Sequence, residues 1–505
     1  MKFVKKLAFS GAIIAASTAV AATQTKVDID TLLARTKKLE QELKTVKAEQ
    51  ARHQKIVTKK KKSKVQPKYI SMPLSVHTLE TEPELLSFHP SALMAGDYIL
   101  TYIAGVPVVT SPYLGERPAF DGSDLIVNIS SINQDVRLMM QRNAISRALK
   151  KLGYPDPNSP IIALSGAIEP YSMTNKPYTG KRSWDIDLGT AELDIATALN
   201  SWVEGYFSFS YDNSPPAISG RRMNNSTVRL GKGFVNIGNL DRTPFYFTAG
   251  QLYVPFGRYS SSMISAPLPL LMSRTIARPI ILGFRHQHGP GLYGALYAFK
   301  SDTTLNSRAV GGVNLGYDFE FNDARGEIGI SYISGVNDAS GMQGTGNPAG
   351  QFGGFGATTA TEAVKKIPAI DLHANINVDA FNFAAEWVGV SQSFRTADLS
   401  YNTRGAKPQA LNIEGAYTFK VANKPASVGV GYGWSDQGVA LGLPKYRIAG
   451  VFNVSIWRDT VESIEFRHDV DYGTSSQGAG IGSTAATRGT GRHSNTLTAQ
   501  LGIYF

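Results

Sequence analysis

Side chains able to bind an anion recur at alternate positions of several strand-like segments. They are Arg229, Arg285, Lys445, Arg447 and Arg467, and Glu465 lies two residues before the last of them. A guanidinium group binds a carboxylate through two parallel hydrogen bonds, so arginines that face a wet interior could hold a carboxylate-bearing solute. Pairing of these cations with Glu465 and other acids on neighbouring strands is the structural alternative.

A connection at 255–277 offers a second candidate site. It contains Arg258, Tyr259 and the serine run at 260–262. Folded inward, this segment would narrow the interior as a constriction and place Arg258 and Tyr259 beside a passing solute. An ordinary surface loop is the alternative, and the residues alone do not separate the two.

Motifs for catalysis or for cofactor binding are weak. The chain has no cysteine, which excludes disulfides, thiolate metal sites and a cysteine nucleophile. His286 and His288 share a face at a strand end without an evident third ligand, which is typical of a turn. The glycine-rich run 478–483 is not followed by a helical pattern, so it predicts a flexible loop and no phosphate cradle. We therefore predict no enzyme, no catalytic residue, no metal and no cofactor.

The elements that would position these residues are strands. Residues 160–505 contain sixteen strand-length runs with period-two patterning, and no run of 18 apolar residues occurs beyond the first 22. Short connections, such as those near Asn200, Ala380 and Arg458, alternate with long ones, such as 336–366 and 472–493. The sequence therefore predicts an all-β fold: a 16-stranded antiparallel transmembrane β-barrel with both ends in the periplasm.

Side-chain alternation and the last run indicate where this barrel would lie. Phe207 and Phe209 share a face opposite Ser208 and Ser210. In a transmembrane barrel the apolar face meets lipid and the polar face lines a wet lumen. The last run alternates up to Phe505, which resembles the assembly signal of outer-membrane barrels. We predict a location in the bacterial outer membrane, with membrane lipid and the barrel-assembly machinery as partners.

The N-terminal segment carries the positive charge of the chain. Residues 1–22 have the pattern of a secretory signal peptide, cleaved after Ala21 or Ala22. Residues 23–65 follow as an amphipathic heptad helix and a basic linker, which could form a periplasmic coiled coil that joins copies of the chain or could serve as a solvated spacer. Residues 1–68 hold 17 Lys+Arg and 5 Asp+Glu, which leaves 34 and 35 for the remainder. Because the excess lies in one arm, no nucleic-acid partner is expected.

Residues 66–159 predict a small mixed α/β segment. Strands are expected at 98–103, 106–109 and 124–129, and Asn133 resembles the N-cap of a helix that Gly153 ends. The segment could plug the lumen or could stand in the periplasm, and the pattern leaves both open.

Two stretches of sequence resemble a known family. Segment 234–257 (FVNIGNLDRTPFYFTAGQLYVPFG) and segment 120–133 (FDGSDLIVNISSIN) are similar to parts of the LbtU-type siderophore porins, which include FupA/FslE-like outer-membrane proteins. The order of coil, middle segment and barrel is also similar. The resemblance implies uptake of iron or of a ferric polycarboxylate siderophore. It supplies no ligand residues.

Three functions remain open at this point. The first is the siderophore or iron porin, and since no TonB-box-like stretch is evident in the chain, uptake without TonB coupling is expected. The second is a general diffusion porin for small solutes. The third, of a different class, is a structural envelope protein that uses its periplasmic coiled coil.

Overall fold

The computed structural model describes residues 99–103, 106–110, 118–119, 127–128, 132–151, 161–212, 227–287, 290–301, 309–321, 324–345, 364–457, 460–480 and 486–504. The expected signal peptide with Ala21 and Ala22, the expected coiled coil and linker at 23–65, and Phe505 lie outside these residues. None of the described helices is long and apolar enough to span a bilayer.

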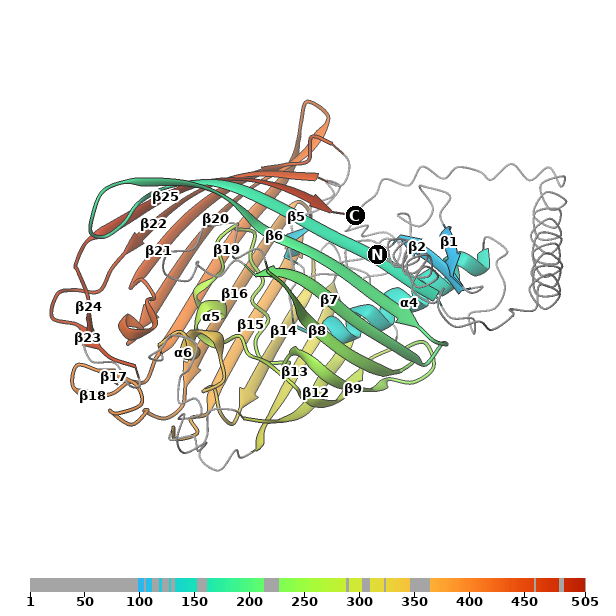
Figure 1. Cartoon of the computed structure of the whole chain (residues 1–505), viewed down its shortest axis with the longest axis horizontal. Helices are drawn as coiled ribbons and strands as arrows, with labels where there is room; N and C mark the ends of the chain where they lie inside the picture. Colours follow the sequence, from blue (N-terminus) through green and yellow to red (C-terminus); the bar gives the residue numbers. More distant parts are fainter. Residues whose placement is uncertain are drawn as a thin grey trace, which may run out of the picture. The chain divides into compact units, whose positions relative to one another are not determined.

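A closed antiparallel β-barrel of sixteen strands makes up the main sheet, as the sequence predicts (Figure 1). Its strands, each hydrogen-bonded to the next, are β5 (Ile161–Lys176), β6 (Ser183–Ala198), β7 (Val203–Asp212), β8 (Thr227–Gly238), β9 (Phe245–Tyr253), β11 (Ile280–Arg285), β12 (Gly291–Lys300), β13 (Ala309–Phe321), β14 (Ala324–Ile333), β15 (Ala369–Val378), β16 (Phe381–Val390), β19 (Gln409–Val421), β20 (Lys424–Asp436), β21 (Tyr446–Val454), β22 (Thr460–Val470) and β25 (His493–Tyr504). Pairing between 495–504 on β25 and 167–176 on β5 closes the barrel.

The two faces of the barrel wall differ in chemistry. Outward positions carry exposed apolar side chains, such as Phe383 at 51% and Leu497 at 51% exposure, whereas inward Asn382 and Glu386 are buried. Exposure of this apolar face to water is unfavourable, whereas its contact with lipid is not. A closed barrel also pairs the backbone hydrogen-bonding groups of its strands with one another, as the membrane interior requires. The protein is therefore a barrel of the bacterial outer membrane, which confirms the predicted location.

Connections of different length separate the two ends of the barrel. Short turns such as 379–380 and 422–423 lie at one end, and Asp379, Ala422 and Asn423 adopt positive φ there, as hairpin turns between twisted strands require. Long connections lie at the other end and carry β17 (Ser400–Tyr401), β18 (Arg404–Gly405), β23 (Gln477–Gly478), β24 (Thr487–Arg488), α6 (Ser340–Gln343) and the short 3-10 helix η4 (Val439–Leu441) (Figure 1). These small elements escaped the sequence pattern because each is only two to four residues long.

The middle segment contributes two hairpins and a helix. Strands β1 (Ile99–Ile103) and β2 (Val106–Thr110) form one hairpin, and β3 (Pro118–Ala119) pairs with β4 (Val127–Asn128). Strand β2 adds in parallel to β5 at 162–164, below the point where β25 ends, and so covers a strand edge that would otherwise be open. Helix α4 (Gln134–Lys151) begins directly after Asn133, close to the position that the sequence predicts.

Candidate functional site: the barrel interior

Residues 254–279 cross the inside of the barrel, and we call them the luminal segment. They follow β9 and contain α5 (Leu268–Ser273), and at their end β10 (Ile276–Ala277) pairs with β9 in the wall and leads to β11. Three glutamates on distant strands hold their backbone. The amide of Arg258 donates to Glu386 at 2.8 Å, that of Ser262 to Glu414 at 2.6 Å, and that of Ser265 to Glu465 at 3.0 Å. Carboxylates accept such bonds more strongly than neutral groups do, and they satisfy amides that this irregular backbone cannot pair itself.

Arg258 and Tyr259 both lie within this segment. The Arg258 guanidinium pairs with Glu327 on β14. Burial alone would lower the pKa of Arg258, but the Glu327 carboxylate outweighs it and the pKa is raised. The Tyr259 hydroxyl lies 3.0 Å from Ser273 Oγ, and burial raises its pKa well above the ordinary value. Both side chains therefore fasten the luminal segment to the wall and to itself.

Removing one glutamate clamp should destabilise the barrel. Glu414 accepts from the Ser261 hydroxyl at 2.7 Å as well as from the Ser262 amide. Hydrogen bonds to a charged group contribute about 1.5–3 kcal/mol each, so Glu414→Ala should lower the unfolding temperature in detergent clearly. The exposed Glu320, near the short-turn end of β13, is the control, and Glu320→Ala should leave the unfolding temperature nearly unchanged. Equal stability of the two variants would contradict the clamp.

Three of the predicted anion-binding cations are paired with acids inside the barrel. Arg285 Nη2 lies 2.6 Å from Asp318 Oδ2. Arg447 and Arg467 share Asp469, at 2.7 Å and 3.0 Å, and Arg447 Nη1 also donates to the Ala266 carbonyl of the luminal segment at 3.0 Å. The acids that pair with these three arginines are thus Asp318 and Asp469.

The remaining predicted residues lie in other settings. Lys445 pairs with Asp436 at 2.9 Å and lies over the Trp434 ring. Arg229 lies opposite Ser210 on the inward face and is exposed. Glu465, predicted as a partner for the arginines, instead accepts the Ser265 amide described above. Of these cations, Arg229 and the partly exposed Arg467 are the inward-facing ones that water reaches most.

Water reaches the inner wall over the broadest area on one side of the barrel. The luminal segment lies over β16 and β19, whose inward Glu386, Asn412 and Glu414 are buried. On β22, β25, β5, β6, β7 and β8, by contrast, a contiguous set of inward residues toward the long-connection end is partly or fully exposed. We call this set the open arc; it comprises Arg467, Thr498, Gln500, Tyr171, Met173, Asn175, Asp185, Asp187, Ser210 and Arg229.

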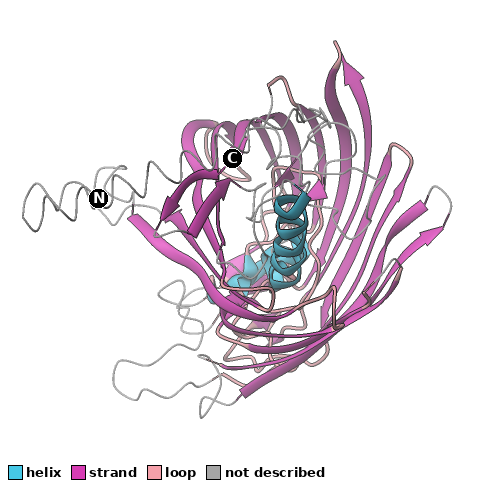
Figure 2. Ribbon diagram, turned by 90° about the vertical axis from the view of Figure 1, so that its right-hand side faces the viewer, coloured by secondary structure: helices cyan, strands magenta, loops and turns pink. Residues whose placement is uncertain are grey.

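The first half of α4 lies inside the barrel, as Figure 2 shows, and we call residues 132–143 the luminal helix. Gln134 donates to the Tyr206 hydroxyl at 2.9 Å, and the Thr248 hydroxyl donates to Asp135 at 2.9 Å. Arg142 Nη2 donates to the Gly238 carbonyl at 2.6 Å and lies 3.5 Å from Glu204 through Nη1. Burial raises the pKa of Asp135.

Apolar packing completes this contact between helix and wall. Ile132, Val136, Leu138 and Met139 are buried in it. Two small cavities, of about 20 Å³ and about 10 Å³, lie at this contact. The luminal helix thus fills the short-turn side of the interior along β6–β9 and lies below the open arc.

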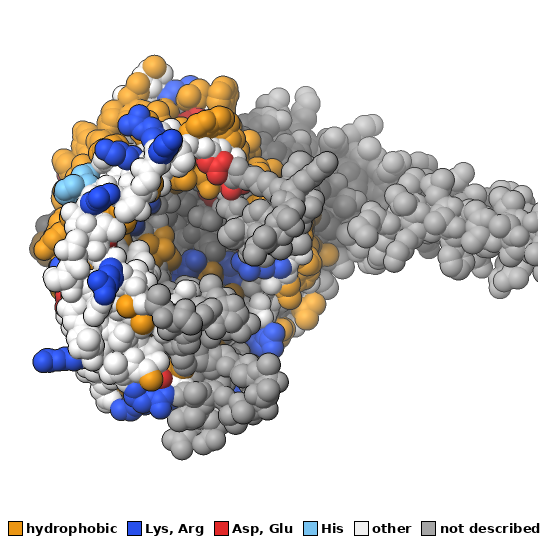
Figure 3. All heavy atoms as spheres, turned by 60° about the vertical axis from the view of Figure 1, so that its left-hand side comes forward, with side chains coloured by type: hydrophobic (Ala, Val, Ile, Leu, Met, Phe, Trp, Pro, Cys, Tyr) orange, Lys and Arg blue, Asp and Glu red, His pale blue; other side chains and the backbone are white. Residues whose placement is uncertain are grey.

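The mouth at the long-connection end is basic. Exposed cations among the described residues there include Lys176, Lys181, Arg182, Arg229, Arg278, Lys300, Lys365, Arg395, Arg404, Lys407, Arg488 and Arg492. The acids with described side chains in the same region, Asp185, Asp187, Asp338, Asp398, Asp436, Asp469 and Asp471, are buried or half-buried. Figure 3 shows the resulting basic groups around and inside the opening, with apolar side chains on the flank of the barrel. Among the described residues, positive charge therefore dominates the surface that a solute from outside would meet.

Comparison with known proteins places the chain in a family. No family model matches it. It is 54% identical over 456 residues to UPF0422 protein lpl2888 of Legionella pneumophila strain Lens, a match that covers 89% of this chain and 86% of the relative. It is 37% identical over 402 residues to the UPF0422 protein of Coxiella burnetii, covering 78% and 83%. The chain belongs to the UPF0422 family.

Solved structures similar to this UPF0422 chain include two outer-membrane proteins. The anion-selective porin from Comamonas acidovorans has a TM-score of 0.45 and 12% identity, with 69% of this chain and 100% of that chain covered. The outer membrane channel DcaP of Acinetobacter baumannii has a TM-score of 0.44 and 11% identity, with 70% and 99% covered.

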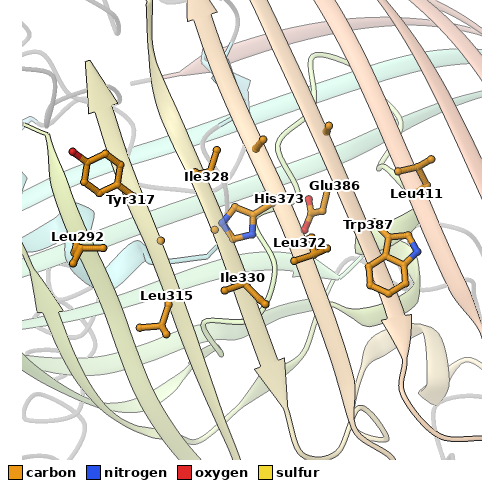
Figure 4. Close-up of a pocket in the computed structure, with 14 residues that line it drawn as sticks. Leu292, Leu315, Tyr317, Ile328, Ile330, Leu372, His373, Glu386, Trp387 and Leu411 are labelled. Carbon is orange, nitrogen blue, oxygen red and sulfur yellow. The ribbon is translucent and has the colours of Figure 1, made fainter. Parts of the chain in front are cut away.

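A groove of about 610 Å³ on the UPF0422 barrel lies outside the lumen. Figure 4 shows its apolar lining, which includes Leu292, Leu315, Ile328 and Leu372. These residues occupy outward positions and are 47–63% exposed. The groove belongs to the lipid-facing surface, so it is no part of a path for a polar solute.

Proposed function

We propose that this UPF0422 protein is an outer-membrane channel for an anionic, carboxylate-rich ferric chelate, and specifically a porin for ferric siderophore uptake. The observation that carries the proposal is the basic mouth, which leads into the open arc. The resemblance to LbtU-type siderophore porins supplies the cargo class. Entry is by diffusion, without TonB coupling.

Charge at the mouth would act before any contact is made. A cluster of exposed cations at an entrance raises the local concentration of anions and their rate of arrival, because field lines focus in a low-dielectric opening. The acids nearby are less accessible, so they weaken this field less than their number suggests. A polycarboxylate chelate would therefore be favoured over a neutral solute of the same size.

Inside the mouth, Arg229 and Arg467 are the residues that we assign to the solute. Both face the open arc, where a guanidinium can exchange a protein partner for a solute carboxylate. Arg447 and Arg285 have other roles: the first fastens the luminal segment, and the second pairs with Asp318 on the neighbouring wall. A general diffusion porin is the second candidate, because these inward ion pairs give a lumen of mixed sign.

The luminal helix is assigned the role of a plug. It closes the short-turn side of the interior, below the open arc, and its polar contacts can be replaced by water when it leaves. Passage then needs release of the helix toward the periplasm, where the short turns lie.

Substitution of the two assigned arginines tests the cargo. Arg229→Gln with Arg467→Gln should slow entry of ferric citrate into proteoliposomes several-fold and leave entry of a neutral sugar unchanged, because only the anion loses its partners. Arg242→Gln, which removes an exposed charge from a turn at the opposite end, is the control and should have little effect on either. Unchanged ferric citrate entry in the double variant would refute these assignments, and an equal fall for the sugar would favour a general porin.

A further inference from the structure

A polar cluster interrupts the apolar outer face of the barrel where β22, β25 and β5 meet. We call its members Lys176, His468, His493 and Asn495 the rim cluster. Their strand positions place them outward: His468 follows Ile464 and Phe466 at two-residue steps, and Asn495 and His493 precede Leu497 in the same way. Lys176 lies directly opposite Asn495 in the sheet, so it shares that face.

The rim cluster is ordered by contacts among its own members. His468 Nδ1 lies 2.6 Å from Asn495 Oδ1, so the ring donates this proton to the amide oxygen. The His468 and His493 rings are stacked, with centroids 5.1 Å apart and planes 21° apart. Because Nδ1 of His468 is engaged by Asn495, Nε2 is the ring atom that can reach a ligand. Lys176 and His493 thus present donors on one small area, and Nε2 of His468 adds a third N–H donor only when the His468 ring is an imidazolium.

The surroundings locate the rim cluster at the edge of the membrane. On the next outward positions toward the short-turn end, Phe466 and Leu497 are 52% and 51% exposed, and Trp184 beside β5 is 73% exposed. Indole rings gather at membrane–water interfaces, and a cation facing the hydrocarbon core of a barrel costs roughly 2–4 kcal/mol. The cluster therefore lies level with lipid headgroups on the side of the long connections, which is the outer leaflet.

Charge around the rim cluster favours an anion. Among the described outward positions of β5, β22 and β25, the acidic residue is Glu462. It lies at the other end of β22, away from the rim cluster. Asp469, the acid next to His468 in the chain, faces inward and is engaged by Arg447 and Arg467. On the neighbouring strands, Tyr446 and Ile448 of β21 and Trp184 and Ile186 of β6 are the outward residues at this level.

The geometry points to a binding site for a phosphorylated lipid headgroup of the outer leaflet, held by Lys176, His468 and His493 at the seam of the barrel. Phosphate oxygens accept bonds from an ammonium group and from imidazole N–H groups, and the acyl chains would lie along Phe466 and Leu497 below. This site is separate from the lumen and does not depend on the proposed transport.

Lipid A tests the site in the full-length protein purified in detergent. Diphosphorylated lipid A should raise the unfolding temperature and appear as a bound species in native mass spectrometry, whereas dephosphorylated lipid A and inorganic phosphate should do neither. The variant Lys176→Gln/His468→Asn/His493→Asn should bind at least several-fold more weakly. Lys300→Gln, an outward lysine at the same end on β12, and His286→Asn at the short-turn end are matched controls that should bind as the wild type does.

Each outcome decides for or against the site. Undiminished binding by the triple variant, or equal binding of dephosphorylated lipid, would overturn it. A response to inorganic phosphate alone would show an anion site that is not specific to lipid, which also contradicts the assignment. If the triple variant does not assemble, Lys176→Gln and His493→Asn singly, both at exposed side chains, should each still weaken binding.

Discussion

Leu501→Arg should lower the yield of assembled barrel, whereas Gln500→Arg should be tolerated. The two residues are adjacent on β25 and lie on opposite faces: Leu501 is outward and 36% exposed, and Gln500 is inward on the open arc. An arginine that faces lipid costs roughly 2–4 kcal/mol at the bilayer midplane and less toward the membrane interfaces, whereas one that faces water does not carry this cost. The measurement is the amount of heat-modifiable folded protein in outer-membrane fractions.

The same pair separates the barrel from other β folds. If the apolar face were the core of a sandwich, Leu501→Arg would disrupt folding in any solvent, including detergent micelles with short chains. In a barrel the variant should regain folding in thin or short-chain lipid, since the cost falls as the apolar layer thins. Equal assembly of Leu501→Arg and Gln500→Arg would show that the assigned faces are wrong.

Arg142→Ala should open the channel. Arg142 lies beside the buried Glu204 and donates to Gly238, so its loss leaves Glu204 without its cation while the luminal helix is in place. Removing one partner of a buried ion pair costs roughly 3–5 kcal/mol. Water can solvate Glu204 once the helix has left, so the cost falls on the closed state and the equilibrium shifts toward release. Conductance in planar bilayers should rise by at least about tenfold, which corresponds to 1.4 kcal/mol.

A reversible lock distinguishes release of the helix from general damage to the barrel. The chain has no cysteine, so Asp135→Cys with Thr248→Cys introduces one new pair at a place where the native side chains are 2.9 Å apart. In the Arg142→Ala background, oxidation should return the channel to low conductance and reduction should restore the high value. Either single cysteine variant should not respond. Conductance that ignores oxidation in a cross-linked sample would contradict the plug.

The barrel could be predicted because its signals are local. The side-chain alternation at 207–210 follows from the two-residue period of a strand. The short turn near Ala380 and the alternating connection lengths follow because strands that are neighbours in the sheet are also neighbours in sequence. The order of outward Phe381 and Phe383 and inward Asn382 is readable without any distant contact.

The interior could not be predicted in the same way. The luminal segment is fixed by contacts such as Ser265 to Glu465, which are 200 residues apart in the chain. The sequence around Ser265 gives no sign of that partner. It therefore does not decide whether the segment folds into the barrel or lies on the surface. Glu386 is not among the predicted site residues, although a single acid at an inward position of a strand with no other charged residue is a usable signal. The position of α4 likewise depends on Glu204 and Thr248 far along the chain.

The ion pairs in the structure decide which of the predicted cations can bind a solute. The sequence grouped Arg285, Arg447 and Arg467 by their position on strands, and only the structure shows that Arg447 holds the Ala266 carbonyl. Whether an arginine fastens the luminal segment or can reach a solute depends on its exposure. The alternation of inward and outward positions along a strand does not give that exposure. This leaves Arg467 and Arg229 as the residues to test.

Solute entry into proteoliposomes tests the central claim most directly. Wild-type protein and the Arg142→Ala variant, each reconstituted at equal density, are compared with protein-free liposomes for entry of ferric citrate and of a neutral sugar of similar size. We expect entry of both solutes above the protein-free rate, faster for ferric citrate than for the sugar, and fastest in the Arg142→Ala variant. No entry of either solute through assembled protein, even in that variant, would contradict a channel, and faster entry of the sugar would contradict its anionic cargo.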